Sequence, residues 1–157
     1  FCILIIGVSL VMAFQTGNRS LVVLQRSQER IEAIKLAEKQ IESLRYVARG
    51  ANDTEQTRFY DILTETGASI CLVAGQSAPS DGARFSIDAI NMQIFDSDEE
   101  KCRTNELYVS SIETTRKNDT LGVYYDFTVT VTWDGLPGSA KPKETVQMYY
   151  RLNREQL

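Results

Sequence analysis

The stretch that decides the fold stands at the start of the chain and reads Phe1-Cys2-Ile3-Leu4-Ile5-Ile6-Gly7-Val8-Ser9-Leu10-Val11-Met12-Ala13-Phe14. It has no charged side chain and a single hydroxyl group. As a helix it would reach ~21 Å, short of the ~30 Å hydrocarbon core of a bilayer. Leu21 to Leu24 is apolar again, so a helix over residues 1–24 would be ~36 Å long and would span a membrane. Because residue 1 is not Met, we expect that a leader was removed in front of the apolar run, whereas cleavage of a secretory signal peptide would remove the run itself.

Residues 24–49 predict an amphipathic continuation of this helix. The segment contains neither Gly nor Pro, and its apolar residues recur every three, four or seven positions, as one helical face requires: Leu24, Ile31, Ile34, Ala37, Ile41, Leu44 and Ala48. Opposite charges stand at helical spacing, as in Glu32 and Lys35. Gly50 stands where a C-cap glycine belongs. An unbroken helix over residues 1–49 would be about 74 Å long.

One segment inside this helix is open to two interpretations. Residues 15–20, Gln-Thr-Gly-Asn-Arg-Ser, are poor helix formers, and Gly17-Asn18 is the plausible break. Either the segment unwinds when subunits pack together, or the helix is unbroken and tolerates one glycine.

An apolar helix that begins at Phe, continues as an amphipathic helix and precedes a β-rich head with two cysteines resembles the type IV pilin and pseudopilin family. The helix motif is also similar to the Ala-x-x-Leu-Ala-Glu-x-x-Ile-Glu-x-Leu-Arg stretch of minor pilins, and here it reads Ala33-Ile34-Lys35-Leu36-Ala37-Glu38-Lys39-Gln40-Ile41-Glu42-Ser43-Leu44-Arg45. The resemblance is specific over residues 1–50 and architectural over the rest. One position departs from the family pattern: the usual glutamate of the fifth mature position is Ile5.

The resemblance implies a structural subunit of an extracellular filament that is a helical homo-oligomer. It implies a processed, methylated amino terminus at Phe1, residence in the inner membrane as a single-pass protein before assembly, and contact with the pilus assembly machinery. The expected domains are a membrane or filament-core helix (1–24), an amphipathic helix packed on the head (25–50) and a globular head (51–157). We expect assembly to depend on apolar side chains and on two arginines, namely Ile3, Leu4, Ile5, Ile6, Leu10, Phe14, Arg26 and Arg30.

Two alternatives to the structural subunit remain open. One is a minor or tip pilin, or a secretion or competence pseudopilin, whose head binds a surface, DNA or cargo. Ile5 favours this alternative. A tip subunit has no subunit above it, so it needs no glutamate to neutralise the amino terminus of a neighbour. The other is an ordinary single-pass protein with a sensory or adhesive head.

Composition argues against catalysis and against nucleic-acid binding by the head. The chain has no His, so the commonest general base and metal ligand is missing, and it has no Gly-rich phosphate loop. Residues 1–49 carry a charge of +3 and the remainder −7, which together give the net charge of −4; an acidic head repels phosphates. We therefore expect no enzyme, no cofactor and no metal, with a solvated acidic turn favoured over a Ca²⁺ site at residues 96–100.

The cysteines of the head predict a disulfide. A disulfide between Cys71 and Cys102 would close a loop of about 31 residues. Such a disulfide fits an extracytoplasmic location, because disulfides persist in oxidising environments. The alternative is two free thiols. Cys2 lies in the apolar run and is interpreted as a small apolar residue.

The head predicts an α+β fold in which the second half of the long helix packs on an antiparallel sheet. Apolar residues alternate with polar ones over 123–134 and 145–152, and more weakly over 107–115, which is typical of half-buried strands. Short connections between them, including residues 116–122, indicate an antiparallel meander. Residues 51–67 predict a loop and a short helix capped by Asn52 or Thr54, while 70–73 and 83–87 are short candidate strands in an otherwise irregular region.

Overall fold

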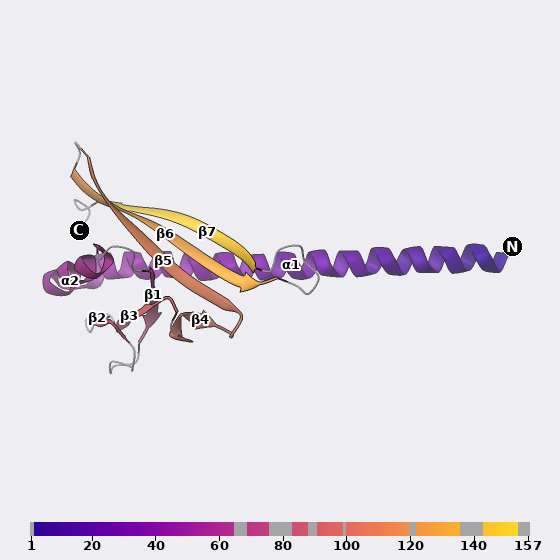
Figure 1. The fold of residues 1–157 in the computed structure, drawn as a ribbon, viewed down its shortest axis with the longest axis horizontal. Helices are drawn as coiled ribbons and strands as arrows, with labels where there is room; N and C mark the ends of the chain where they lie inside the picture. The colour runs from indigo at the N-terminus through magenta and orange to yellow at the C-terminus, as the bar shows by residue number, and fades with distance from the viewer. Residues whose placement is uncertain are drawn as a thin grey trace. The chain divides into compact units, whose positions relative to one another are not determined.

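The computed structural model describes residues 2–64, 69–75, 83–87, 91–98, 100–119, 122–135 and 143–153, with the side chains at 2–5, 8, 119 and 153 outside this description. Within these described residues, the elements follow one another in the order α1 (Cys2–Gly50), α2 (Asp53–Thr64), β1 (Ser69–Ala74), β2 (Phe85–Ile87), β3 (Met92–Asp96), the 3-10 helix η2 (Glu100–Cys102), β4 (Arg103–Thr104), β5 (Tyr108–Asp119), β6 (Gly122–Asp134) and β7 (Lys143–Asn153) (Figure 1). The chain divides into two compact units, Phe1–Glu32 and Ala33–Leu157.

Helix α1 runs without a break through residues 15–20. The hydroxyl of Thr16 donates to the carbonyl oxygen of Met12 (2.8 Å), and the hydroxyl of Ser20 donates to that of Thr16 (3.1 Å). Each hydroxyl group thus forms a hydrogen bond with a backbone carbonyl of the preceding helical turn, so its donor is satisfied without breaking the helix. The helix is therefore unbroken in the single chain, and unwinding of this segment when subunits pack together stays a prediction. In the part of the chain that the structure describes, no helix combines the length and the apolar character needed to cross a membrane.

The buried face of α1 in the second unit follows the predicted helical stripe with additions. Ala37, Ile41, Leu44 and Ala48 are buried, as the periodicity predicts, whereas Ile34 is half-buried. Leu24 and Ile31 are exposed. The face also includes residues outside the predicted stripe, namely Ala33, Gln40 and Val47.

Gln40 is the unexpected member, because its polar side chain is buried. Its Nε2 donates to the carbonyl oxygen of Leu72 (2.9 Å), and its Oε1 accepts from the backbone N–H of Leu72 (3.0 Å). Strand β5 pairs with β1 only at Ser69 and Ile70. Further along β1, the amide of Gln40 therefore takes the place of a neighbouring strand and satisfies backbone groups that burial would otherwise leave without partners.

We predict that Gln40→Leu lowers the free energy of unfolding by about 1–3 kcal/mol, because Leu72 loses partners for a buried donor and acceptor. Urea unfolding in mild detergent, followed through the fluorescence of Trp133, the single tryptophan, measures the change. Lys39→Leu is the matched control, because Lys39 is exposed on the same helix and an exposed substitution changes stability by less than about 0.5 kcal/mol. Equal unfolding midpoints for the two variants would contradict the role given to Gln40.

Helix α2 begins with the cap that the sequence predicts at Asn52. The Oδ1 of Asn52 accepts from the backbone N–H of Glu55 (2.9 Å), and the Glu55 carboxylate faces the N–H of Asn52 (3.4 Å). This reciprocal arrangement is a capping box. It directs α2 so that Phe59 and Leu63, four residues apart, are both buried.

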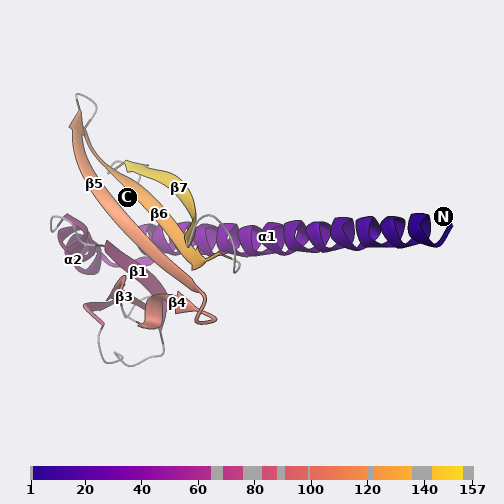
Figure 2. The same ribbon diagram turned by 45° about the vertical axis from the view of Figure 1, so that its right-hand side comes forward.

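The strands named above form one antiparallel sheet with the order β2-β3-β1-β5-β6-β7, and β4 pairs with β5. The predicted meander is confirmed as β5, β6 and β7. Figure 2 shows these three long strands side by side. Strand β5 extends to Asp119, so residues 116–119 belong to the strand and the prediction of a connection there is wrong. Residues 70–73 lie in β1, and residues 85–87 of the second candidate form β2. Strand β3, with the sequence Met-Gln-Ile-Phe-Asp, lies in the region that the sequence left irregular.

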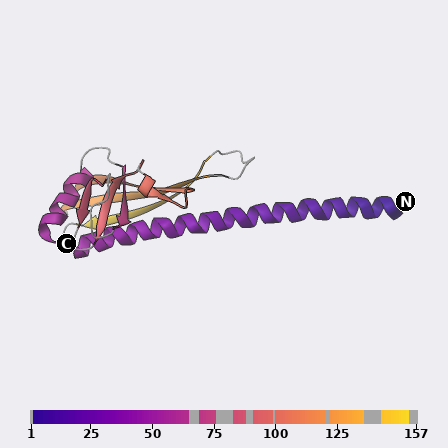
Figure 3. The same cartoon turned by 90° about the horizontal axis from the view of Figure 1, so that it is seen from below.

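The core lies between the sheet and the helices of the second unit. One cluster joins α1 and α2 to the inner face of the sheet, where Phe127, Val129 and Val131 of β6 are almost fully buried. Figure 3 shows the sheet along one side of the part of α1 that belongs to this unit. The predicted α+β class, with the second half of the helix packed on an antiparallel sheet, is confirmed.

Candidate functional site

The first candidate site is the apolar surface of the first unit. The exposed fractions of Ile6, Leu10 and Phe14 are 63%, 59% and 70%. Their spacing of four residues places them on one helical face. Further large apolar side chains are exposed along the same unit, namely Val11, Met12, Leu21, Val22, Val23, Leu24 and Ile31. Apart from Ile31, these side chains form two apolar segments, 6–14 and 21–24, separated by the polar residues 15–20, and exposed apolar segments of this size mark a surface for a protein or lipid partner.

Four of the predicted assembly or modification positions lie outside what the structure describes. Phe1 is not described, and the side chains of Ile3, Leu4 and Ile5 are not described although their backbone belongs to α1. The predictions at these positions stay predictions.

Two glycines, Gly7 and Gly17, interrupt the side chains of this surface. A Cβ atom added at Gly7 or Gly17 would meet no atom within 4 Å, so neither glycine is required by the fold of the described residues. In a helix interior, glycine costs up to about 1 kcal/mol relative to alanine. These positions therefore permit close approach of another helix without serving the fold of this chain.

The two predicted assembly arginines follow the apolar surface along α1. Arg26 and Arg30 are exposed and stand four residues apart, so they lie on one helical face. Arg19 is exposed as well. The first unit thus combines an apolar surface with an exposed basic row.

The predicted disulfide is present between Cys71 and Cys102, whose Cα atoms lie 5.7 Å apart. Both residues are buried, and with Phe95 they form a small cluster separate from the main core. Cys71 alternates with Ile70 and Leu72 along β1, which contribute to the main core. The disulfide therefore joins η2 to the opposite face of the sheet.

The outer face of β5, β6 and β7 carries a second candidate, a group of charged side chains around Asp126. Arg151 donates to both carboxylate oxygens of Asp126 (2.6 and 3.1 Å), and the ammonium of Lys117 lies 3.3 Å from the same carboxylate. These hydrogen bonds, that of Arg151 first, hold the pKa of Asp126 below its ordinary value. The guanidinium of Arg151 also lies over the ring of Tyr124, 4.4 Å from its centroid. The group has one carboxylate and two cations, and its charge-assisted hydrogen bonds link three neighbouring strands.

The tyrosine pairs of β6 and β7 divide between the two faces of the sheet, as strand alternation requires. Tyr125 stacks on Tyr60 at 4.7 Å between ring centroids, and burial raises the pKa of Tyr60. Tyr150 packs beside Phe127 and under Arg45. Tyr149, by contrast, is 76% exposed on the outer face. Tyr149 and Tyr150 are thus neighbours in β7 that point to opposite faces of the sheet.

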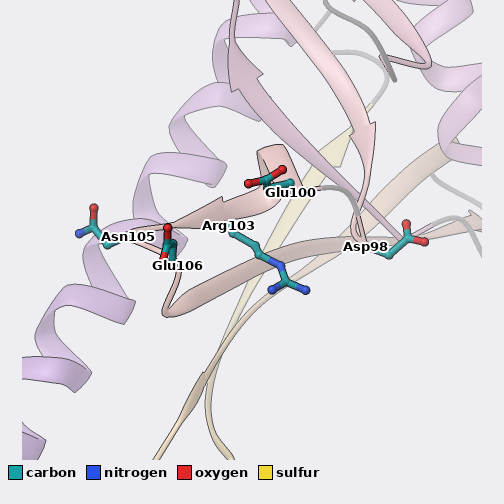
Figure 4. A pocket seen from close by; sticks show the side chains of 5 residues that line it. All are labelled: Asp98, Glu100, Arg103, Asn105 and Glu106. Atoms are coloured by element: carbon teal, nitrogen blue, oxygen red, sulfur yellow. The ribbon is translucent and has the colours of Figure 1, made fainter.

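A cavity of about 690 Å³ beside the disulfide is lined by Asp98, Glu100, Arg103, Asn105 and Glu106. In Figure 4 the carboxyl groups lie spread around Arg103 rather than converging on one point. Among the described residues, no group of three His, Cys, Asp or Glu side chains could hold a metal ion. The neighbouring Asp96, considered for Ca²⁺, forms an ion pair with Arg84 instead (3.2 Å).

No family model matches this chain, and neither a curated protein nor a solved structure matches it.

Proposed function

We propose that the protein is a structural subunit of an extracellular filament of the type IV pilus kind, assembled through the first unit of α1. The observation that carries the proposal is the change in burial along one unbroken helix. Its described side chains from Ile6 to Gln28 are exposed, whereas those on one face from Ala33 onward are buried in the core of the second unit. A helix of this kind anchors a folded head at one end and offers an apolar surface to other molecules at the other.

The proposed mechanism is mechanical. Before assembly, residues 1–24 reside in the inner membrane, where the apolar surface contacts lipid. The assembly machinery then transfers this surface into a bundle of equivalent helices at the filament core. Relative to water, full burial stabilises each large apolar side chain such as Leu10 or Phe14 by about 1.5–3 kcal/mol. With at least ten such side chains exposed in the first unit, subunits in a filament would not exchange freely with subunits in water.

Ile5 supports a second candidate, a tip or minor subunit whose head contacts a surface, DNA or secreted cargo. In the family, glutamate at this position is thought to pair with the amino terminus of the next subunit, and an unpaired buried ammonium is costly. A subunit with no neighbour above it does not need the acid. In the structural-subunit proposal, Arg26 and Arg30 align neighbouring subunits in place of that glutamate. They do so because they face acidic residues of another copy, such as Glu38.

Reversal of both arginines, Arg26→Glu with Arg30→Glu, tests the proposal. We expect filament yield to fall while the head still folds, because like charges then face the acidic residues of neighbouring subunits close to the core, where salt screens little. Electron microscopy of surface filaments, with the subunit identified in the density, measures the yield.

The matched control reverses two exposed cations of the head, Lys101→Glu with Arg116→Glu, and makes the same change in net charge. Filament yield should stay near that of the unmodified chain. Unchanged filaments after the Arg26 and Arg30 reversals would exclude charge registry and favour the tip subunit. Absence of the unmodified chain from every filament would overturn both candidates.

A further inference from the structure

The edge of the sheet at β7 lacks most of the features by which proteins commonly protect an edge strand. Among the described strands, β7 has a neighbour on one side only, β6. It is 11 residues long and contains no proline. Its register with β6 is continuous from Lys143 to Asn153, so no bulge interrupts it. Short length, proline, bulges and charges are the usual protections, and β7 has charges only toward its two ends.

The inner face of β7 is incompletely covered. Val146, Met148 and Tyr150 pack against the main core but are only half-buried. The residues that face them across the ladder, Val131, Val129 and Phe127, are 0–1% exposed. One further strand beside β7 would continue the apolar row and would pair the backbone groups that point away from β6.

The sequence of β7 is complementary to itself. When two copies run antiparallel with Met148 opposite Met148, all 11 residues pair, and inner side chains meet inner side chains as the period of two requires. Val146 then faces Tyr150. On the outer face, Thr145 faces Arg151, and no like charges stand opposite each other.

Neighbouring registers are less favourable. Centring the pairing on Gln147 places Lys143 opposite Arg151, and like charges directly opposite are destabilising. Centring it on Tyr149 leaves Lys143 and Glu144 beyond the pairing. A shift by one residue turns the apolar row of one copy to the outer face of the other.

We propose that β7 is a docking site for β7 of a second copy of this chain, and that the two strands pair antiparallel about Met148 to make one continuous sheet. The contact has a two-fold axis, whereas a polar filament is built from head-to-tail contacts. The pairing therefore joins copies that do not belong to the same filament. It stands independently of the proposed function.

Position-specific disulfide formation tests the pairing in the full chain, held in mild detergent with Cys2→Ser to remove the other free thiol. Directly opposite residues have Cα atoms about 4.5–5.5 Å apart, within reach of a disulfide. We expect Met148→Cys to form covalent dimers under mild oxidation. Thr145→Cys is more exposed, but its two copies would lie ~20 Å apart, so we expect at least about tenfold less dimer.

A mixture of two variants checks the register. Thr145→Cys and Arg151→Cys should form little dimer separately and should cross-link when mixed, because the register places these residues opposite each other. The fluorescence of Trp133 verifies that each variant is folded. The proposal is overturned by a folded Met148→Cys that forms no dimer, by equal dimer from Thr145→Cys alone, or by cross-linking of Met148→Cys only to a different protein, which would assign the edge to a foreign strand.

Discussion

If the proposed function holds, Leu10→Asp should reduce filament assembly at least about a hundredfold and leave the head folded. This is the largest effect that we expect. Leu10 is 59% exposed and makes no contribution to the core of the second unit, so the substitution has little to disturb in the isolated subunit. In a bundle of equivalent helices, the same carboxylate would be buried without a partner, which costs about 3–5 kcal/mol. Since 1.4 kcal/mol corresponds to a factor of ten, the assembled fraction should fall at least about a hundredfold.

The matched control is Asn18→Asp, which adds the same charge to the same helix at a position that is already polar and exposed. We expect filaments close to the unmodified yield. Filament counts by electron microscopy measure assembly, and Trp133 fluorescence measures folding of the head. A normal filament yield for Leu10→Asp would show that this surface is not the assembly surface.

Loss of the disulfide should produce the largest change in the stability of the head. Replacing Cys71 and Cys102 by Ala removes a bridge that closes a loop of 31 residues, and loop closure of this size contributes about 3–4 kcal/mol. Both side chains are buried beside Phe95, so the truncation adds a packing loss. Urea unfolding of the full chain in detergent, followed through Trp133, should show a lower midpoint.

Reductant provides the control for this experiment. Dithiothreitol, present during unfolding, should lower the midpoint of the unmodified chain to near that of the double variant, and should leave the double variant unchanged. Mass spectrometry should detect alkylation of Cys71 only after reduction. Alkylation of Cys71 without prior reduction would mean that the cysteines are free in the protein as produced.

The sequence by itself determined the elements whose signal is local and strongly periodic. Spacing of three and four residues predicted the long helix, because every third or fourth side chain shares a helical face. Alternation over 123–134 and 145–152 predicted β6 and β7 for the same reason, with a period of two. The sequence offered Asn52 or Thr54 as the cap of α2, because capping residues lie within one turn of the helix start, and the structure has Asn52 in that role. With only two cysteines in the head, the sequence limited a disulfide there to Cys71 and Cys102, and the structure decided between a bonded pair and two free thiols.

The tertiary structure alone decided the features that depend on neighbours distant in the chain. Gln40 looks like a solvent-facing residue of an amphipathic helix, and it is buried only because Leu72, 32 residues away, offers it two backbone groups. Strand β3 has five residues, of which Met92, Gln93, Ile94 and Phe95 are all buried, so it shows no alternation. Its pairing with β1 makes it a strand. The unprotected edge at β7 was likewise invisible in the sequence, because strand order is a property of the assembled sheet and leaves no periodic mark on any one strand.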